Sequence, residues 1–344
     1  DDYFNTVLYT GNATARSITG VGFQPDWVWS KARGLTQSHR LVDSTRGVQK
    51  SLYSNSTDTE GTESGLTAFN ADGFSIGTET SFNYNTEPFV AWNWKANGGV
   101  ATASGSESGN TLAYSAQANT TSGFSIVTYT GNGANNADVT INHGLGVTPD
   151  WVIIKNRTNG NRWHVWHKDL SADGTYTTKN ILLNTSAGED AYSDQIKSVS
   201  SSAVIVRSDD SNGNANVNKD SSNYVMYCFH SVEGYSRFGS YTGNGNNDGT
   251  YVFTGFRPAW VLIKKSGSGT ASHWRLTDTT RSPFNVTDAA LSPSSNAAEF
   301  SENDMDILSN GFKLRQSNTY VSQSGVSFIY MAFAEAPFKY ANAR

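Results

Sequence analysis

Apolar residues in this chain occur in short runs that are separated by polar stretches rich in glycine, asparagine, serine and threonine. Residues 151–154 (Trp-Val-Ile-Ile) and 260–263 (Trp-Val-Leu-Ile) are typical of these runs. Short apolar runs that are bounded by turn residues indicate buried β-strands rather than amphipathic helices. The pattern therefore predicts an all-β chain of antiparallel strands, with no convincing helix.

Two sequence motifs occur three times along the chain. A Tyr-Thr-Gly-Asn turn occupies residues 9–12, 129–132 and 241–244. Each turn is followed by a Pro-x-Trp strand with a lysine four residues after the tryptophan. Glycine and asparagine supply the positive φ angles that tight hairpin turns need. The tryptophans open apolar strands, so we expect them to be the structural core of each repeat; they are Trp27, Trp151 and Trp260.

The spacing of the repeats sets the domain organisation. Trp151 follows Trp27 by 124 residues and precedes Trp260 by 109 residues. This period is far longer than the roughly 20 to 50 residues of solenoids and propellers, and it matches a small domain. We therefore predict three tandem antiparallel β-sandwich, jelly-roll-like modules, at residues 1–97, 122–231 and 232–344. Residues 98–121, rich in Gly, Ser and Thr, are predicted to be a linker.

Composition and charge narrow the class of partner. Only 16% of the residues are charged, and the formal net charge is −5. This argues against nucleic acid as a partner, because phosphate binding needs clustered Lys and Arg. No stretch approaches the ~18 apolar residues of a membrane span, so we expect no membrane insertion. The single cysteine, Cys228, lies in an apolar run and is expected to be a buried, unreactive thiol.

Aromatic residues make up 12% of the chain, and those in polar surroundings are candidates for contact with sugars. Aromatic side chains present a large apolar surface on which a sugar ring can stack. Most aromatic residues of this chain lie in apolar strands and are expected to be core. The glycan-contact candidates are Trp163, Trp166, Trp274 and Tyr84.

No residue pattern predicts catalysis or metal binding. His164 and His167 would point to opposite faces of a strand, because side chains alternate with a period of two. Asp43, Asp169 and Asp278 recur in the three copies, and a structural Asp–Arg pair or a turn cap explains them more simply than acid/base chemistry. The sequence therefore predicts no catalytic residue, no metal and no cofactor.

The repeated motifs also carry a resemblance. The Tyr-Thr-Gly-Asn turns, the Gly-Phe-x-Pro-x-Trp-Val-x-x-Lys strands and the closing residues 330–340 (Tyr-Met-Ala-Phe-Ala-Glu-Ala-Pro-Phe-Lys-Tyr) resemble an uncharacterised repeat domain of marine bacteriophage structural proteins. The resemblance covers nearly the whole chain. It implies a tail-fibre-like or other virion component, located at the virion surface or outside the cell, and it implies no catalytic residues. Similar proteins usually carry more chain ahead of the first module, whereas this chain opens inside it.

The leading functional hypothesis is a non-enzymatic bacteriophage virion appendage protein, a tail fibre or surface fibre, which displays repeated β modules for host-surface adhesion. The second is a self-assembling extracellular filament or coat subunit, and the third is a polysaccharide-degrading tailspike. Virion appendages work by repeated symmetric contacts, so we expect a homo-oligomer. A host surface glycan and other virion proteins are the further partners that we expect.

Overall fold

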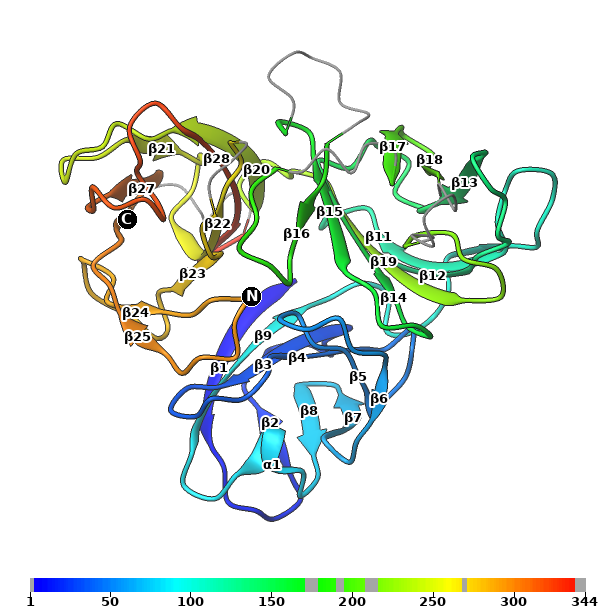
Figure 1. Cartoon of the computed structure of the whole chain (residues 1–344). Helices are drawn as coiled ribbons and strands as arrows, with labels where there is room; N and C mark the ends of the chain where they lie inside the picture. Colours follow the sequence, from blue (N-terminus) through cyan, green and yellow to red (C-terminus); the bar gives the residue numbers. More distant parts are fainter. Residues whose placement is uncertain (1–2, 171–178, 190–194, 208–215, 268–270, 338–344) are drawn as a thin grey trace.

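The computed structural model describes residues 3–170, 179–189, 195–207, 216–267 and 271–337. Within these residues the chain is almost entirely β-strand, and the single helix, α1 (Thr80–Asn83), is one turn long. No helix in this part is long and apolar enough to cross a membrane. Residues 338–340 of the closing motif lie outside the described part. Figure 1 shows three lobes around a common centre, and each lobe corresponds to one repeat of the sequence.

The first repeat builds two antiparallel sheets. Its larger sheet has the strand order β1-β9-β3-β4 and its smaller sheet the order β2-β8-β7, while β5 pairs with β6. The strands are β1 (Phe4–Thr10), β2 (Arg16–Thr19), β3 (Trp27–Ala32), β4 (Arg40–Asp43), β5 (Lys50–Ser51), β6 (Gly61–Thr62), β7 (Leu66–Asn70), β8 (Gly73–Ile76) and β9 (Pro88–Trp94).

The second repeat has a wider main sheet. Its larger sheet has the order β10-β11-β12-β19-β14-β15-β16 and its smaller sheet the order β13-β18-β17. The strands are β10 (Ala103–Gly105), β11 (Tyr114–Asn119), β12 (Phe124–Thr130), β13 (Asp138–Asn142), β14 (Trp151–Asn156), β15 (Trp163–His167), β16 (Ile181–Leu182), β17 (Ile196–Val199), β18 (Ala203–Arg207) and β19 (Asn223–Phe229).

The third repeat returns to the plan of the first. Its larger sheet has the order β20-β28-β22-β23 and its smaller sheet the order β21-β27-β26, while β24 pairs with β25. The strands are β20 (Ser236–Thr242), β21 (Tyr251–Phe253), β22 (Pro258–Lys265), β23 (Arg275–Asp278), β24 (Ala289–Ala290), β25 (Phe300–Ser301), β26 (Met305–Leu308), β27 (Gly311–Leu314) and β28 (Ser327–Ala334).

The same strand order and register occur in all three repeats. The four strands β1-β9-β3-β4 correspond to β12-β19-β14-β15 and to β20-β28-β22-β23. The core tryptophans lie opposite equivalent residues of the last strand, because Trp27 faces Trp94, Trp151 faces Phe229 and Trp260 faces Phe333. The predicted all-β fold of antiparallel sheets is confirmed. The register also fixes which residues of one repeat are the counterparts of residues in another.

The stretch 98–121, predicted to be a linker, instead contains two strands. Strand β11 pairs antiparallel with β12 along its whole length, from Asn119 opposite Phe124 to Tyr114 opposite Tyr129, and β10 pairs with β11. The prediction failed because an edge strand can be built from small and polar side chains. These residues widen the larger sheet of the second repeat.

The larger sheets of all three repeats pack on one shared aromatic core. Trp27 of the first repeat lies 4.5 Å from Tyr227 of the second, and Trp94 of the first lies 5.6 Å from Trp260 of the third, measured between ring centroids. Each repeat also has its own smaller core between its two sheets. Alternate side chains of a strand in a larger sheet therefore pack into the shared core and into the repeat's own core. Each repeat buries part of its apolar surface against the other two.

Counterpart hydrogen bonds link the repeats in a closed ring. Three buried side chains each donate a ring N–H to a backbone carbonyl of another repeat: His39 Nε2 to Ser292 (3.1 Å), Trp163 Nε1 to Tyr53 (2.8 Å) and Trp274 Nε1 to Leu182 (3.1 Å). Trp29 donates to Nδ1 of His39, so Nε2 must carry the proton. The first repeat thus contacts the third, the second contacts the first and the third contacts the second.

Buried ion pairs lie at two of these junctions. Arg46 pairs with Asp43 and Arg281 pairs with Asp278, and all four side chains are inaccessible to solvent. Each aspartate accepts a further hydrogen bond from another repeat: Tyr227 Oη donates to Asp43 (2.7 Å) and Trp92 Nε1 donates to Asp278 (2.9 Å). A buried charge is tolerated when it is paired and hydrogen-bonded in this way.

At the junction of the second and third repeats, neutral residues stand in place of the Asp–Arg pair. Asp43 and Asp278 lie opposite Trp27 and Trp260, but His167 lies opposite Trp151. His167, rather than Asp169, is therefore the counterpart in the second repeat, which corrects the predicted Asp43/Asp169/Asp278 correspondence. Leu170 stands three residues later, where the other repeats have arginine. The aspartate and the arginine are absent together, so no unpaired charge is left at this position.

Candidate functional site: a groove along strand β20

The expected contact with glycans is wrong for three of the four candidates. The side chains of Trp163, Trp166 and Trp274 are almost completely buried. Trp163 and Trp274 face the shared core, and Trp166 faces the second repeat's own core. Their polar sequence neighbours misled the prediction, because both faces of these strands are covered. Only Tyr84, just after α1, is exposed, by 47%.

The three repeat tryptophans lie where the core should be. Trp27, Trp151 and Trp260 occupy equivalent buried positions in the shared core. Their indole rings pack against other aromatic rings of the core, as Trp151 does against Trp274 at 5.9 Å. These residues are structural, and none of them reaches a surface where a ligand could bind.

The histidines and aspartates that were weighed for metal binding or acid/base catalysis are buried and have structural roles. Burial lowers the pKa of both His164 and His167 to about 3, so both rings are neutral. Asp43 and Asp278 are occupied by their arginine partners. In the described ranges, no group of three or more His, Cys, Asp or Glu side chains could hold a metal ion.

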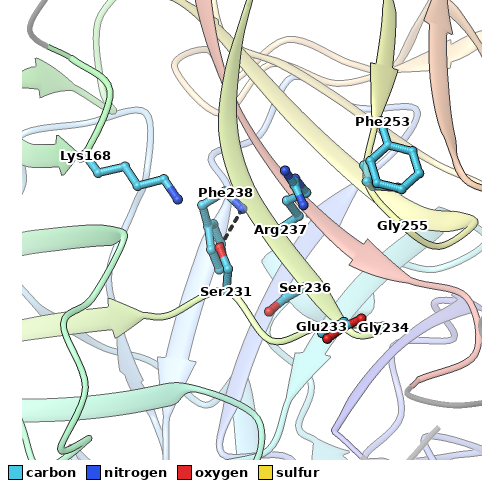
Figure 2. A pocket seen from close by; sticks show the side chains of 10 residues that line it. Lys168, Ser231, Glu233, Gly234, Ser236, Arg237, Phe238, Phe253 and Gly255 are labelled. Atoms are coloured by element: carbon cyan, nitrogen blue, oxygen red, sulfur yellow. Dashed lines mark hydrogen bonds between the residues drawn. The ribbon is translucent and has the colours of Figure 1, made fainter.

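A groove opens between the second and third repeats, and we call it the β20 groove. Its deeper part has a volume of about 510 Å³ and an adjoining part has about 320 Å³. The two parts share Lys168, Arg237, Phe238 and Phe253, so they form one continuous groove. Further lining residues include Asp169, Ser231, Glu233, Ser240, Tyr251 and Gly255. Figure 2 shows Lys168, Arg237 and Phe253 arranged around the deeper part.

The aromatic wall of the groove comes from strand β21. Tyr251 and Phe253 are 43% and 53% exposed, while Val252 between them is buried in the third repeat's own core. Alternate residues of a strand point to opposite faces, so the buried valine turns both aromatic rings outward. The alternation Tyr-Val-Phe after the third Tyr-Thr-Gly-Asn turn was visible in the sequence, and it is the signal that could have identified this wall.

One cation of the groove, Lys168, is held by a partly buried carboxylate. Lys168 Nζ lies 3.1 Å from Asp150, which also accepts a 2.7 Å hydrogen bond from the backbone N–H of Ser231. Burial opposes ionisation of Asp150, but the hydrogen bonds from Ser231 and the charge of Lys168 outweigh it and lower the pKa of this carboxyl. Lys168 remains 38% exposed at its side chain and faces the groove.

The second cation of the groove is Arg237, which lies beside an aromatic ring. The guanidinium carbon of Arg237 lies 5.9 Å from the ring centroid of Phe253, and Arg237 also hydrogen-bonds to Tyr330. Among the described residues, Arg237 forms no ion pair with a carboxylate within 4.0 Å. Glu233 also lines the groove, and Figure 2 shows it on the far side from Lys168. An exposed guanidinium that has no carboxylate partner and lies beside an aromatic ring is suited to binding an acidic group.

The floor of the groove is an edge strand. Strand β20 pairs with β28 on one side and has no strand among the described residues on the other. The outward N–H groups of Ser236 and Phe238 are satisfied locally, by Val232 O (2.9 Å) and Ser231 Oγ (3.1 Å). In an antiparallel strand, the N–H groups that point away from the neighbouring strand recur at every second residue. The next such N–H group in β20 after Phe238 is that of Ser240, and no described residue accepts a hydrogen bond from it. The groove therefore exposes unpaired backbone.

A second, shallower pocket lies at the junction of the first and second repeats. Its volume is about 590 Å³, and Arg40, Tyr53, Asp58 and Gly160 are among its lining residues. Arg40 and Tyr53 are already bonded to Glu63, at 3.0 and 2.6 Å. The polar groups of this pocket are therefore largely satisfied within the protein, unlike those of the β20 groove.

Comparison with other proteins identifies a family without an assigned role. No curated protein and no solved structure is similar enough to match the chain. The sequence profile described as "Domain of unknown function (DUF7483)" matches residues 1–337 and thus almost the full length of the chain. The chain belongs to this DUF7483 family.

Proposed function

We propose that the chain is a non-enzymatic protein of a bacteriophage virion, a component of a tail fibre or surface fibre that displays three β-sandwich, jelly-roll-like modules for adhesion to a host surface. The observation that carries this proposal is the closed ring of repeats with a groove that exposes an edge strand and Arg237, which forms no ion pair with a carboxylate of the described residues. Such a body has a binding surface and rigid internal joints. The repeated motifs, through their resemblance to virion repeat domains, support the location.

The groove serves this function as a point of attachment. An appendage protein needs one contact that mounts it on the particle and another surface that meets the host. The β20 groove has the unpaired backbone and charge that a mounting contact uses, and it lies between two repeats that are fixed relative to each other by the Trp274–Leu182 hydrogen bond.

Immuno-electron microscopy tests the proposal. Antibody against this chain should decorate phage particles at a fibre or at the particle surface, and purified labelled protein should bind cells of the host. Antibody that decorates no particle, together with protein that binds no cell, would overturn the proposed function.

A host surface glycan is the ligand that we propose for adhesion, and Tyr84 is the sequence-predicted contact that is exposed. Stacking of a sugar ring on a tyrosine depends on its aromatic face. Tyr84→Ala should weaken retention on an array of bacterial polysaccharides. Phe284→Ala is the matched control, because Phe284 is an exposed aromatic residue of the third repeat, 82% accessible to solvent. Equal retention of both variants and the wild type would remove Tyr84 from the proposal.

A second candidate function is a self-assembling filament or coat subunit, and the open edge of β20 is the observation that favours it. Edge strands readily pair with other chains. This candidate predicts a homo-oligomer whose interface exceeds about 1,000 Å² in total. Sedimentation and negative-stain micrographs of the purified chain separate it from the first candidate, since only this one requires filaments or shells from the chain alone.

A further inference from the structure

We propose that the adjoining part of the β20 groove, which Arg237 and Tyr251 both line, binds a neutral oligosaccharide. This inference rests on the proposed function, because that function makes a host surface the source of the sugar. The volume of this part, about 320 Å³, lies at the lower end of the range of ligand pockets. The deeper part of the groove, which Glu233, Thr254 and Gly255 line, is left for the attachment contact.

Two exposed aromatic rings lie on one face of strand β21. Tyr251 and Phe253 point to the same face and are 43% and 53% exposed. Residues two apart in a strand are separated by about 7 Å, so the two rings are close enough to stack on neighbouring units of one sugar chain. Among the described residues, no other two exposed large apolar side chains share a strand face.

Neighbouring side chains orient both rings. Tyr251 Oη donates a 2.8 Å hydrogen bond to the side chain of Asn310. The ring of Phe253 lies beside the guanidinium of Arg237, 5.9 Å from the guanidinium carbon to the ring centroid, as Figure 2 shows. A side chain that is already oriented loses less conformational entropy when a ligand binds to it. The two rings therefore form a preorganised surface for stacking.

The fold itself does not require aromatic residues at these two positions. Strands β2, β13 and β21 are counterparts, and their equivalent buried residues are Ile18, Ile141 and Val252. The outward residues on either side are polar in the other two repeats: Ser17 and Thr19 in β2, and Thr140 and Asn142 in β13. The exposed aromatic pair is therefore specific to the third repeat, and packing does not explain it.

The polar groups near the rings include both donors and acceptors of hydrogen bonds. The guanidinium of Arg237 and the backbone N–H of Ser240 are donors, and the carboxylate of Asp169 is an acceptor. A sugar hydroxyl both donates and accepts hydrogen bonds, so it can bond to either kind of group. Aromatic rings beside such groups suit a ligand that has many hydroxyls and apolar C–H faces.

The charges of this part of the groove are balanced, which favours a neutral ligand. Lys168 is paired with Asp150 at 3.1 Å. Asp169 lines the same part of the groove as Arg237. An acidic ligand would be attracted by Arg237 but repelled by Asp169, and a basic ligand would meet the reverse. A neutral oligosaccharide meets neither repulsion.

Retention on a glycan array tests the inference with the full chain. The array carries hexamers of glucose, galactose, mannose, rhamnose and N-acetylglucosamine and, as the charged control, hexamers of galacturonic acid. We expect retention on at least one neutral hexamer, unchanged between about 0.05 and 0.5 M salt, because salt screens interactions between charges.

Variants of the two rings locate the binding. Phe253→Asn and Tyr251→Thr introduce the residues that the second repeat carries at these positions, so their urea midpoints should stay close to that of the wild type. Each should weaken binding about tenfold, because one stacked ring is lost. Phe253→Trp keeps an aromatic ring and should retain binding.

Several results would overturn the inference. Retention on no neutral hexamer would show that the groove binds no such sugar. Equal retention of the wild type, Phe253→Asn and Tyr251→Thr would locate the sugar elsewhere, and a loss with Tyr84→Ala alone would locate it at Tyr84. Retention on galacturonic acid alone, abolished by salt, would assign the groove to an acidic ligand. Antibody decoration of particles decides the proposed function separately, so either can fail without the other.

Discussion

The buried pair Asp278–Arg281 offers a quantitative test of how the ring is held together. Arg281 Nε lies 2.6 Å from Asp278 Oδ2, both side chains are inaccessible to solvent, and Trp92 of the first repeat donates to the same carboxylate oxygen. Arg281→Leu leaves the carboxylate buried with hydrogen bonds but without its cation. Removing one partner of a buried ion pair typically costs about 3–5 kcal/mol. Glu299 loses one contact as well but keeps Arg33, at 2.7 Å, so it adds little to the loss.

The double variant Asp278→Asn/Arg281→Leu separates charge from packing. Asparagine keeps an acceptor for Trp92 but carries no charge, and the second repeat already tolerates an uncharged histidine and leucine at these positions. We expect the double variant to recover at least half of the free energy of unfolding that Arg281→Leu loses. Urea unfolding followed by tryptophan fluorescence gives both values, and a double-mutant cycle gives the coupling. Additive losses, or a loss below about 1 kcal/mol for Arg281→Leu, would refute the reasoning.

Three further predictions concern the core and its buried groups. Trp27→Ala should cost about 3–5 kcal/mol of unfolding free energy in urea titrations, whereas Phe284→Ala should stay within about 0.5 kcal/mol; similar losses would contradict the shared core. Burial lowers the pKa of Lys155 and Lys264 to about 7, far below the unfolded value near 10.4, so the unfolded chain binds more protons between these limits and stability should rise with pH from about 7 to 10. The melting temperature, measured across this pH range, reports the rise in stability, and Lys264→Met should make the rise smaller. An unchanged dependence of the melting temperature on pH would contradict the lowered pKa of Lys264. Burial also raises the pKa of Cys228 well above its usual range, so a thiol reagent should modify it only after unfolding, and rapid reaction of the native chain would disagree.

The strands and their repetition could be predicted from the sequence because they depend on local chemistry. The Tyr-Thr-Gly-Asn turns and the Pro-x-Trp strands mark hairpins and buried strands by themselves, so the core tryptophans were placed correctly. The shared core could not be predicted, because an apolar face does not reveal which sheet will cover it. Trp163 and Trp274 were misplaced for the same reason.

The error at Asp169 has a different cause. Spacing from the core tryptophan is the same for Asp169 and Asp278, and the sequence alone makes them counterparts. The hairpin that leads to Trp274 is longer than the hairpin that leads to Trp163, so the register shifts by two residues and His167 takes the position. The groove residues Lys168 and Arg237 were missed because they belong to different repeats, and only the packing of the second repeat against the third brings them to one groove.

The closed ring of cross-repeat hydrogen bonds limits how a further repeat could be added to this chain. In a linear array each added unit stacks on the end, so the array can grow by gene duplication. Here His39 of the first repeat already bonds to Ser292 of the third, and no end is left for a fourth unit. A fourth unit would have to break one of these junctions, whereas added strands such as β10 and β11 change one junction and leave the other two intact.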